Sequence, residues 1–290
     1  MKNVFPFIFL VALISCNPGA NKKQMPASSG NYKLELVWQS DTLLRTPESV
    51  LLDRDRNILY VSNVNMNPWE KDGNGFISKM DISGNITLLR WIEGLNGPKG
   101  MGISGNSLYI ADIDELVEAN INTGEIIGKI KLEGKPDLND ITVGGDGTVY
   151  VSGSRSNAIY QLKDGTLAEV FKGNEGERFN GLFREKDRIL LLTSTTGLFK
   201  EINPETGAMK VISENMGQGD GIVPVGNGGY LTTSWKGAVF FVSVAGVSTR
   251  LLDTESLGEN AADPDFSIET QVLYLPTFYK NRVKAYRLVK

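Results

Sequence analysis

The stretch Leu59-Tyr60-Val61-Ser62-Asn63 returns in related form along the whole chain. Each copy is a short run of β-branched, leucine or aromatic residues, the composition of a buried strand. Most copies follow a turn signal, such as Gly105-Asn106 or Asp146-Gly147. The six copies are 59–63, 108–112, 149–153, 190–194, 229–233 and 273–277, and their second residues lie 39 to 49 residues apart.

Two further strand-like segments follow each copy and are joined by a hairpin turn. In the third repeat, segments 158–162 and 167–171 flank the turn Lys163-Asp164-Gly165. No segment carries a sustained apolar stripe at helical spacing. Four strands in roughly 40 residues are typical of a β-propeller blade, so the repeat predicts an all-β, six-bladed β-propeller. A β-sandwich would not explain six evenly spaced copies.

The two ends of the repeat region predict how the ring closes. The last copy has only about three strands and ends with 283–289, whereas segment 33–38 precedes the first copy without a partner. Pairing this N-terminal strand with the last blade would remove an exposed sheet edge. We therefore expect one propeller domain over residues 32–290.

The N-terminal segment is typical of an export signal. Residues 1–15 combine a basic start with a short apolar run, too short to span a bilayer as a helix. The run ends at Cys16, the only cysteine, and resembles the bacterial lipoprotein box, in which the cysteine carries the lipid. An ordinary secretory signal is the alternative. Residues 16–31 are polar and rich in Pro, Gly and Ser, which predicts a flexible tether at the bacterial cell envelope, joined to the membrane by a lipid on Cys16.

Composition excludes several kinds of chemistry. The 290 residues include no histidine, so neither a Ser-His-Asp nor a Cys-His nucleophile can form, and no His-ligated zinc or iron. With 30 Lys and Arg against 34 Asp and Glu, the net charge is −4, and no nucleic-acid partner is expected. Any chemistry must use carboxylates, lysine, tyrosine, amides, hydroxyls or a bound hard cation.

A second motif lies 10 to 12 residues before each strand copy. Its middle residues should occupy the same place in every blade, at the start of the innermost strand, and converge around the central channel at one end. They are Glu48, Lys99, Asn139, Asn180, Asp220 and Asp263. Asp140, beside Asn139, should also face the channel.

Oxygen ligands with two or three negative charges suit a hard divalent cation. We therefore predict a shared polar site from Glu48, Asn139, Asn180 and Asp220. In the alternative interpretation, the Asn-Gly and Asp-Gly pairs are ordinary tight-turn residues. Lys99 could pair with Glu48 or Asp263, assist an oxyanion, or take the place of the metal.

These motifs resemble the SMP-30/gluconolactonase family of six-bladed propellers over roughly residues 33–290. The family binds one divalent metal in its channel through a Glu, one or two Asn and an Asp, matched here by Pro-Glu48-Ser, Asn139-Asp140, Asn180-Gly and Asp220-Gly. The resemblance implies a metal that polarises a lactone carbonyl while Asp220 serves as ligand and base. Calcium is the first choice of metal, with Mn²⁺, Mg²⁺ or Zn²⁺ as others.

The chain departs from the family pattern at two places. Gly219 stands where the family commonly has Pro, and the second blade offers Lys99. Two functions therefore remain open: an envelope-anchored, metal-dependent hydrolase of a lactone or related ester, with Asp220 and Lys99 as catalytic groups, or a non-catalytic propeller that binds a sugar, peptide or partner protein. Lys99 in the ring and Trp69 in the first-blade loop favour the second, although packing of Trp69 and Trp235 against blades is the simpler expectation.

Overall fold

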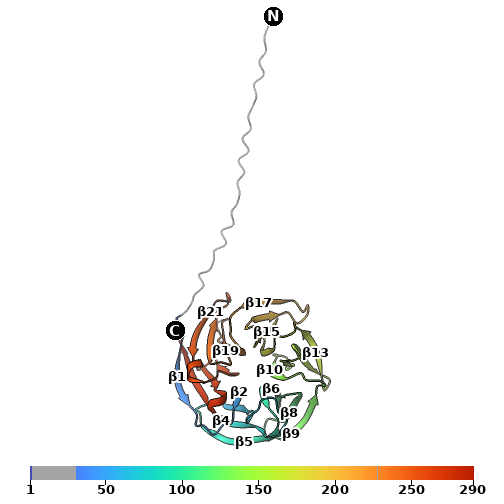
Figure 1. The fold of residues 1–290 in the computed structure, drawn as a ribbon, viewed down its shortest axis with the longest axis vertical. Helices are drawn as coiled ribbons and strands as arrows, with labels where there is room; N and C mark the ends of the chain where they lie inside the picture. Colours follow the sequence, from blue (N-terminus) through green and yellow to red (C-terminus); the bar gives the residue numbers. More distant parts are fainter. Residues whose placement is uncertain (2–30, 227) are drawn as a thin grey trace.

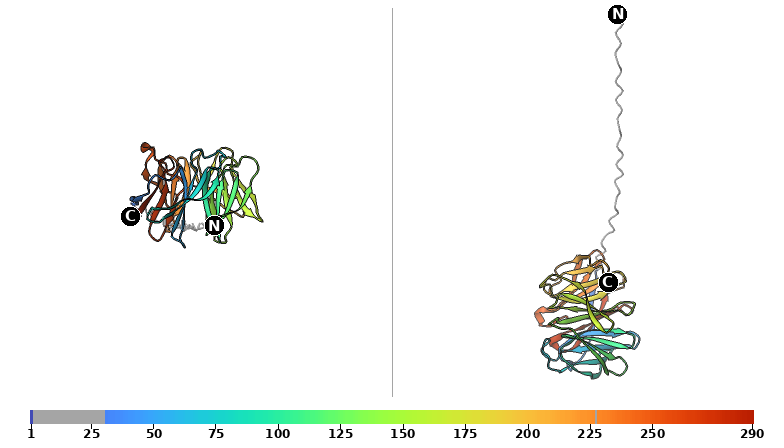
Figure 2. Two further views of the ribbon diagram at one scale, coloured as in Figure 1. Left: turned by 90° about the horizontal axis from the view of Figure 1, so that it is seen from below. Right: turned by 90° about the vertical axis from the view of Figure 1, so that its right-hand side faces the viewer.

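The six-bladed propeller predicted from the repeat is confirmed. The computed structural model describes Met1 and residues 31–226 and 228–290. These residues form six four-stranded antiparallel sheets around a central axis (Figure 1). Figure 2 shows the disc from its edge, with the C-terminus at its outer rim. The predicted signal peptide beyond Met1, Cys16 and the predicted tether up to residue 30 lie outside the described residues.

Each blade is numbered from its innermost strand outward. Blades 1 to 3 consist of β2 (Pro47–Asp53), β3 (Ile58–Asn63), β4 (Gly75–Asp81) and β5 (Ile86–Leu95); β6 (Pro98–Ser104), β7 (Ser107–Asp112), β8 (Glu115–Asn120) and β9 (Ile126–Lys131); and β10 (Leu138–Val143), β11 (Val149–Gly153), β12 (Ala158–Lys163) and β13 (Thr166–Lys172).

Blades 4 to 6 follow the same plan, with the N-terminal strand added to the last. They consist of β14 (Phe179–Arg184), β15 (Ile189–Thr193), β16 (Phe199–Ile202) and β17 (Met209–Ser213); β18 (Gly219–Pro224), β19 (Tyr230–Ser234), β20 (Ala238–Val242) and β21 (Ser248–Asp253); and β22 (Asp265–Ser267), β23 (Val272–Pro276), β24 (Val283–Val289) and β1 (Lys33–Gln39).

The repeated five-residue copies form the second strand of every blade, which is buried almost throughout. Outer strands are more exposed, and β9 alternates between half-buried and exposed residues because successive side chains point to opposite faces of the sheet. The β12–β13 hairpin turns through Asp164 and Gly165, both with positive φ, which are the residue types that a tight hairpin requires.

The apolar core lies between blades. One cluster joins Tyr60 and Ile77 of blade 1 to Leu108 and Val117 of blade 2, and similar clusters fill the other junctions. Because the sheets pack face to face, the side chains that stabilise the ring point sideways and leave the inner strand ends free to line the channel.

The predicted closure is also confirmed. β1 pairs antiparallel with β24 from Lys33↔Val289 to Gln39↔Lys284. Trp38 of this strand contacts Tyr274 with ring centroids 5.9 Å apart and donates a hydrogen bond to the Ile82 carbonyl of blade 1. The N-terminal strand therefore joins the last blade to the first.

Only two short 3₁₀ helices accompany the strands within the described residues: η1 (Glu255–Leu257) and η2 (Phe278–Lys280). No helix in this part of the chain has the length and apolarity needed to cross a membrane.

Candidate functional site

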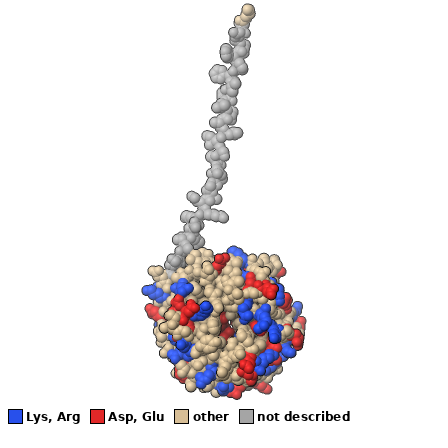
Figure 3. Space-filling view, in the orientation of Figure 1, with Lys and Arg blue, Asp and Glu red and all other residues tan. Residues whose placement is uncertain are grey.

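Five of the six predicted ring residues meet in one cavity of about 450 Å³ at a mouth of the channel. Each is the second residue of an innermost strand and is at most 8% exposed. They are Glu48 of β2, Lys99 of β6, Asn139 of β10, Asn180 of β14 and Asp220 of β18. Figure 3 shows the disc hollowed at its centre, with acidic atoms inside the hollow.

A break in strand pairing turns these residues toward the axis. The pairing of the inner strand with the second strand shifts register at Glu48, and the same shift occurs at the matching place in the next four blades. Hydroxyl groups of the second strand accept hydrogen bonds from the displaced backbone: Ser49 N donates to Ser62 Oγ at 2.9 Å, and Gly221 N to Thr233 Oγ1 at 2.8 Å. Such bulges redirect side chains beside functional sites.

The Asn-Gly and Asp-Gly pairs are therefore not tight-turn residues. Gly181 and Gly221 lie inside strands and lack positive φ. A Cβ at Gly181 would lie 2.2 Å from the Asp220 carbonyl oxygen of the next blade. Glycine follows the polar residue because neighbouring inner strands approach this closely.

Glu48 and Asp220 carry the unbalanced charge of the cavity. Glu48 Oε2 and Asp220 Oδ2 are buried and have no hydrogen-bond partner. Burial raises the pKa of Glu48 well above its ordinary value, with further repulsion from Asp220. Burial also raises the pKa of Asp220, and the Asp263 carboxylate adds to that effect. A bound cation or a proton must compensate these groups.

The side-chain nitrogens of Asn139 and Asn180 both donate hydrogen bonds within the protein. Asn180 Nδ2 donates to Asp220 Oδ1 at 2.7 Å, and Asn139 Nδ2 donates to Ser154 Oγ at 3.1 Å. In this orientation their side-chain oxygens accept no hydrogen bond from a described residue. These two oxygens are thus available to a ligand.

Lys99 pairs with neither Glu48 nor Asp263, contrary to one expectation from the sequence. Its Nζ donates to the carbonyl oxygens of Pro68 at 2.6 Å and Gly97 at 2.8 Å, and lies 4.0 Å from the centroid of the Trp69 ring. Burial lowers the pKa of Lys99 to about 8, and the carboxylate of Glu48 opposes that shift. The ammonium group therefore persists at neutral pH while standing apart from the carboxylates.

Asp263, the sixth predicted member, does not line this cavity with the other five. It precedes β22, and together with Asp140 it lines a second cavity of about 440 Å³ farther along the channel. Asp263 Oδ2 accepts a hydrogen bond from Ser49 Oγ at 2.6 Å, and the Leu182 and Ile141 amides donate to the two oxygens of Asp140. A parallel bridge between Ser49 and Asp263 ties the start of the blade-6 inner strand to β2.

The mouth of the first cavity includes residues that the repeat did not indicate. Four aromatic residues surround part of it: Trp69, Trp235, Phe278 and Tyr279. Trp235 contacts Phe278 and Tyr279 edge to face, with centroids 5.7 and 5.8 Å apart. Both tryptophans border the cavity and do more than fill space between blades. Arg178, Thr195 and Gln218 line it as well.

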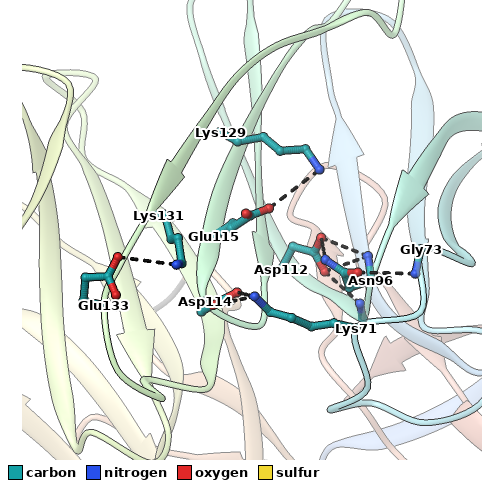
Figure 4. A network of polar contacts seen from close by, with 10 residues as sticks. Lys71, Gly73, Asn96, Asp112, Asp114, Glu115, Lys129, Lys131 and Glu133 are labelled. Carbon is teal, nitrogen blue, oxygen red and sulfur yellow. Dashed lines mark hydrogen bonds and ion pairs between the residues drawn. The ribbon is translucent and has the colours of Figure 1, made fainter.

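The long first-blade loop 64–74 is fastened over blade 2 (Figure 4). Lys71 forms an ion pair with Asp114 at 2.5 Å, and the Gly73 amide donates to Asn96 Oδ1 at 3.3 Å. Asp112 accepts hydrogen bonds from the amides of Asn96 and Gly97. These contacts hold Trp69 and the Pro68 carbonyl against Lys99.

The donor set of the cavity fits a hard cation. Among the described residues, no three His, Cys, Asp or Glu residues gather into a metal-binding group, so the two carboxylates need the amide oxygens as further ligands. Two partnerless carboxylate oxygens and two free amide oxygens form an oxygen-only set, which suits Ca²⁺ better than softer metals.

The chain matches no protein-family model and no curated protein sequence. Solved structures resemble it in fold. They include a gluconolactonase from Xanthomonas campestris (TM-score 0.67, 14% identity, 86% of this chain and 89% of that chain) and a streptogramin B lyase (0.65, 13%, 89% and 98%). A third is virginiamycin B lyase from Staphylococcus aureus (0.63, 13%, 89% and 100%). At these identities the likeness shows a shared propeller fold.

Proposed function

We propose that the protein is a divalent-cation-dependent hydrolase of a lactone or related ester, of the SMP-30/gluconolactonase kind. The observation that carries this proposal is the pair of buried, partnerless oxygens on Glu48 and Asp220. Glu48, Asn139, Asn180 and Asp220 would hold the cation, with Ca²⁺ the first choice. When bound, the cation supplies Lewis-acid polarisation of the substrate carbonyl.

The residues of the chain divide the remaining tasks. Asp220 would accept the proton of the attacking water, because burial and the Asp263 carboxylate raise its pKa well above its ordinary value. Lys99 would place a fixed positive charge near the developing oxyanion, since two carbonyls orient its ammonium group. The surrounding aromatic residues would exclude water from the bound ester.

The similar folds agree with this choice. One is a gluconolactonase. The virginiamycin B lyase is catalytically inactive when one of its histidines is replaced by alanine, in a structure with quinupristin. The present chain has no histidine, which favours carboxylate chemistry over that of the lyase.

The test compares two variants, each of which replaces one channel aspartate by asparagine. Asp220→Asn should weaken Ca²⁺ binding, measured by calorimetry, by about tenfold or more. It should also lower the rate of lactone hydrolysis by about 100-fold or more. Asp263→Asn makes the same chemical change at a buried aspartate outside the cavity. It should retain Ca²⁺ binding and lower hydrolysis much less than Asp220→Asn, because it removes only the charge that helps to raise the pKa of Asp220. Equal hydrolysis by wild type and Asp220→Asn would remove the proposed base.

A binding propeller is the second candidate. The exposed Tyr279 and the half-buried Trp69 and Trp235 at the mouth favour it, because aromatic faces stack on sugar rings or peptide side chains. Saturable binding of a sugar acid without turnover of any lactone or aryl ester would support this candidate.

Envelope anchoring belongs to the same proposal. Residues 1–15 would be removed on export and Cys16 would carry a lipid, which places the propeller at a membrane surface. Labelling of cells with a fatty acid should mark the wild-type protein and not Cys16→Ser. Equal labelling of both would contradict the anchor.

A further inference from the structure

One cationic side chain at the cavity mouth has no partner among the residues that the structure describes. Arg178 immediately precedes β14, lines the cavity and is half-buried. Its guanidinium makes no hydrogen bond or ion pair with any described residue. The nearby Arg155, by contrast, donates from Nε to Asp137 at 2.8 Å.

The backbone of Arg178 is fixed in an unusual conformation. Its φ is 53°, in the left-handed region that residues other than glycine and asparagine seldom adopt. The Arg178 amide donates to Asn157 Oδ1 at 2.6 Å, and its carbonyl accepts from the Ser194 amide at 2.9 Å. Thr46 and Asp137, which precede β2 and β10, also have positive φ, at 45° and 50°. The conformation therefore belongs to the plan of the blades, and it fixes the backbone from which the Arg178 side chain extends.

The neighbours of Arg178 at the mouth are neutral hydrogen-bond donors. Thr195 and Gln218 are exposed, line the same cavity, and their side chains have no hydrogen-bond partner among the described residues. Of the aromatic residues, Trp69 comes from blade 1 and Phe278 and Tyr279 from blade 6, whereas Trp235 comes from blade 5. The rim from blades 4 and 5 therefore combines Trp235 with a cationic and polar edge, beside an acidic floor.

We infer that Arg178 binds a carboxylate group of the substrate, so that the substrate is a lactone or ester carrying a carboxylate away from the carbonyl that is attacked. This inference rests on the proposed function. The planar guanidinium matches a carboxylate through two parallel hydrogen bonds.

A carboxylate brings one negative charge toward Glu48 and Asp220, whereas a phosphate dianion brings two. The cavity, about 450 Å³, suits a compact sugar acid. Arg178 is thus a specificity-determining residue.

The test compares two lactones that differ at one end. Glucarolactone has a carboxylate where gluconolactone has a hydroxymethyl group. With Ca²⁺ present, the wild type should show a lower KM for glucarolactone. Arg178→Gln should raise the KM of glucarolactone by about tenfold or more relative to that of gluconolactone. Arg178→Lys, which keeps the charge and loses the fork, should give an intermediate ratio.

Arg155→Gln is the matched control. It removes the same charge outside the cavity, while glutamine can still donate to Asp137, so the KM ratio should not change. A ratio that is equal in wild type and Arg178→Gln overturns the inference, and the hydrolase proposal then stands on the gluconolactone rate alone.

If the wild type hydrolyses neither lactone, calorimetry with the open-chain acids separates the two ideas. Tighter binding of glucarate than gluconate, lost in Arg178→Gln, supports the carboxylate site although the hydrolase proposal fails. Equal affinity of the wild type for the two acids overturns the carboxylate site.

Discussion

The surroundings of three buried carboxyl groups in the channel determine what each group can do chemically. Glu48 and Asp220 each keep one oxygen without a partner in the first cavity. Asp263 instead accepts a hydrogen bond from Ser49 and borders the second cavity. The sequence assigns these residues to one ring, yet their partners give them different tasks: the first two suit a cation, and the third tunes the charge of Asp220.

The pH dependence of the free energy of unfolding should reveal the ionisation of Asp263. Burial raises the pKa of Asp263 from its ordinary value of 3.8 to about 7. The folded state therefore binds the proton more tightly, and the stability it contributes below about pH 4 is lost as the pH rises toward 7. Repulsion from Asp265 also raises the pKa of Asp263. The ionised Asp263 carboxylate in turn raises the pKa of Asp220.

We expect the free energy of unfolding of the EDTA-treated wild type to fall between pH 5 and pH 8 by on the order of 2 kcal/mol more than that of Asp263→Asn. Urea unfolding at the two pH values measures this difference. Parallel pH dependence in the two proteins would show that Asp263 ionises in the folded state as easily as in water.

At the scale of the element, the inner strand combines a register shift with a glycine. The shift turns Asn180 toward the axis, and Gly181 lets β18 approach β14. The hydroxyls of Ser62, Ser152 and Thr233 satisfy backbone amides freed at such shifts. The polar floor of the site is thus built into the inner strands of the blades, whereas its mouth is formed by the segments between strands.

Gly181→Ala should separate two neighbouring blades. Its Cβ would lie 2.2 Å from the Asp220 carbonyl oxygen, so the backbone must move. We expect a loss of about 1–3 kcal/mol in the free energy of unfolding, together with weaker Ca²⁺ binding. Gly145→Ala is the control, because a Cβ there meets nothing within 4 Å and its φ is not positive. Its stability should stay within about 0.5 kcal/mol of wild type. Similar stability of the two variants would contradict the close approach.

Much of this element could be predicted from the sequence, because a period of about 40 residues fixes which positions face the axis. Glu48, Asn139, Asn180 and Asp220 were found in this way. The partners of Lys99 could not be, since the Pro68 carbonyl belongs to a loop without a repeat counterpart. Arg178 and Tyr279 lie outside the strands, so the strand repeat does not indicate them, and only the structure shows that both line the mouth.

At the scale of the whole molecule, one strand holds the ring closed. Trp38 packs with the cluster between blades 6 and 1, and Leu34 packs with the cluster between blades 5 and 6. β1 also covers the outer edge of β24, which would otherwise offer unpaired backbone groups. Glu48 and Asp263 lie at the junction that this closure secures, where the Asp263 amide donates to the Glu48 carbonyl at 3.0 Å.

Removal of β1 should therefore lower both the solubility and the thermal stability of the propeller. A chain that begins at residue 41 should aggregate or unfold at lower temperature than one that begins at residue 31, because β24 becomes an open edge. Size-exclusion chromatography and thermal unfolding followed by circular dichroism measure the two effects. A monomer beginning at residue 41 with the melting temperature of the longer chain would show that the ring closes without this strand.

The central claim, a cation-dependent hydrolase, is tested most directly by lactone hydrolysis in a pH-stat. The purified protein is assayed with added Ca²⁺, with EDTA, and with Ca²⁺ restored after EDTA. We predict turnover that EDTA abolishes and Ca²⁺ restores, because Glu48 and Asp220 provide charge that only a bound cation or a proton can balance. Turnover that persists unchanged in EDTA, or no turnover of any lactone or aryl ester, would contradict the claim.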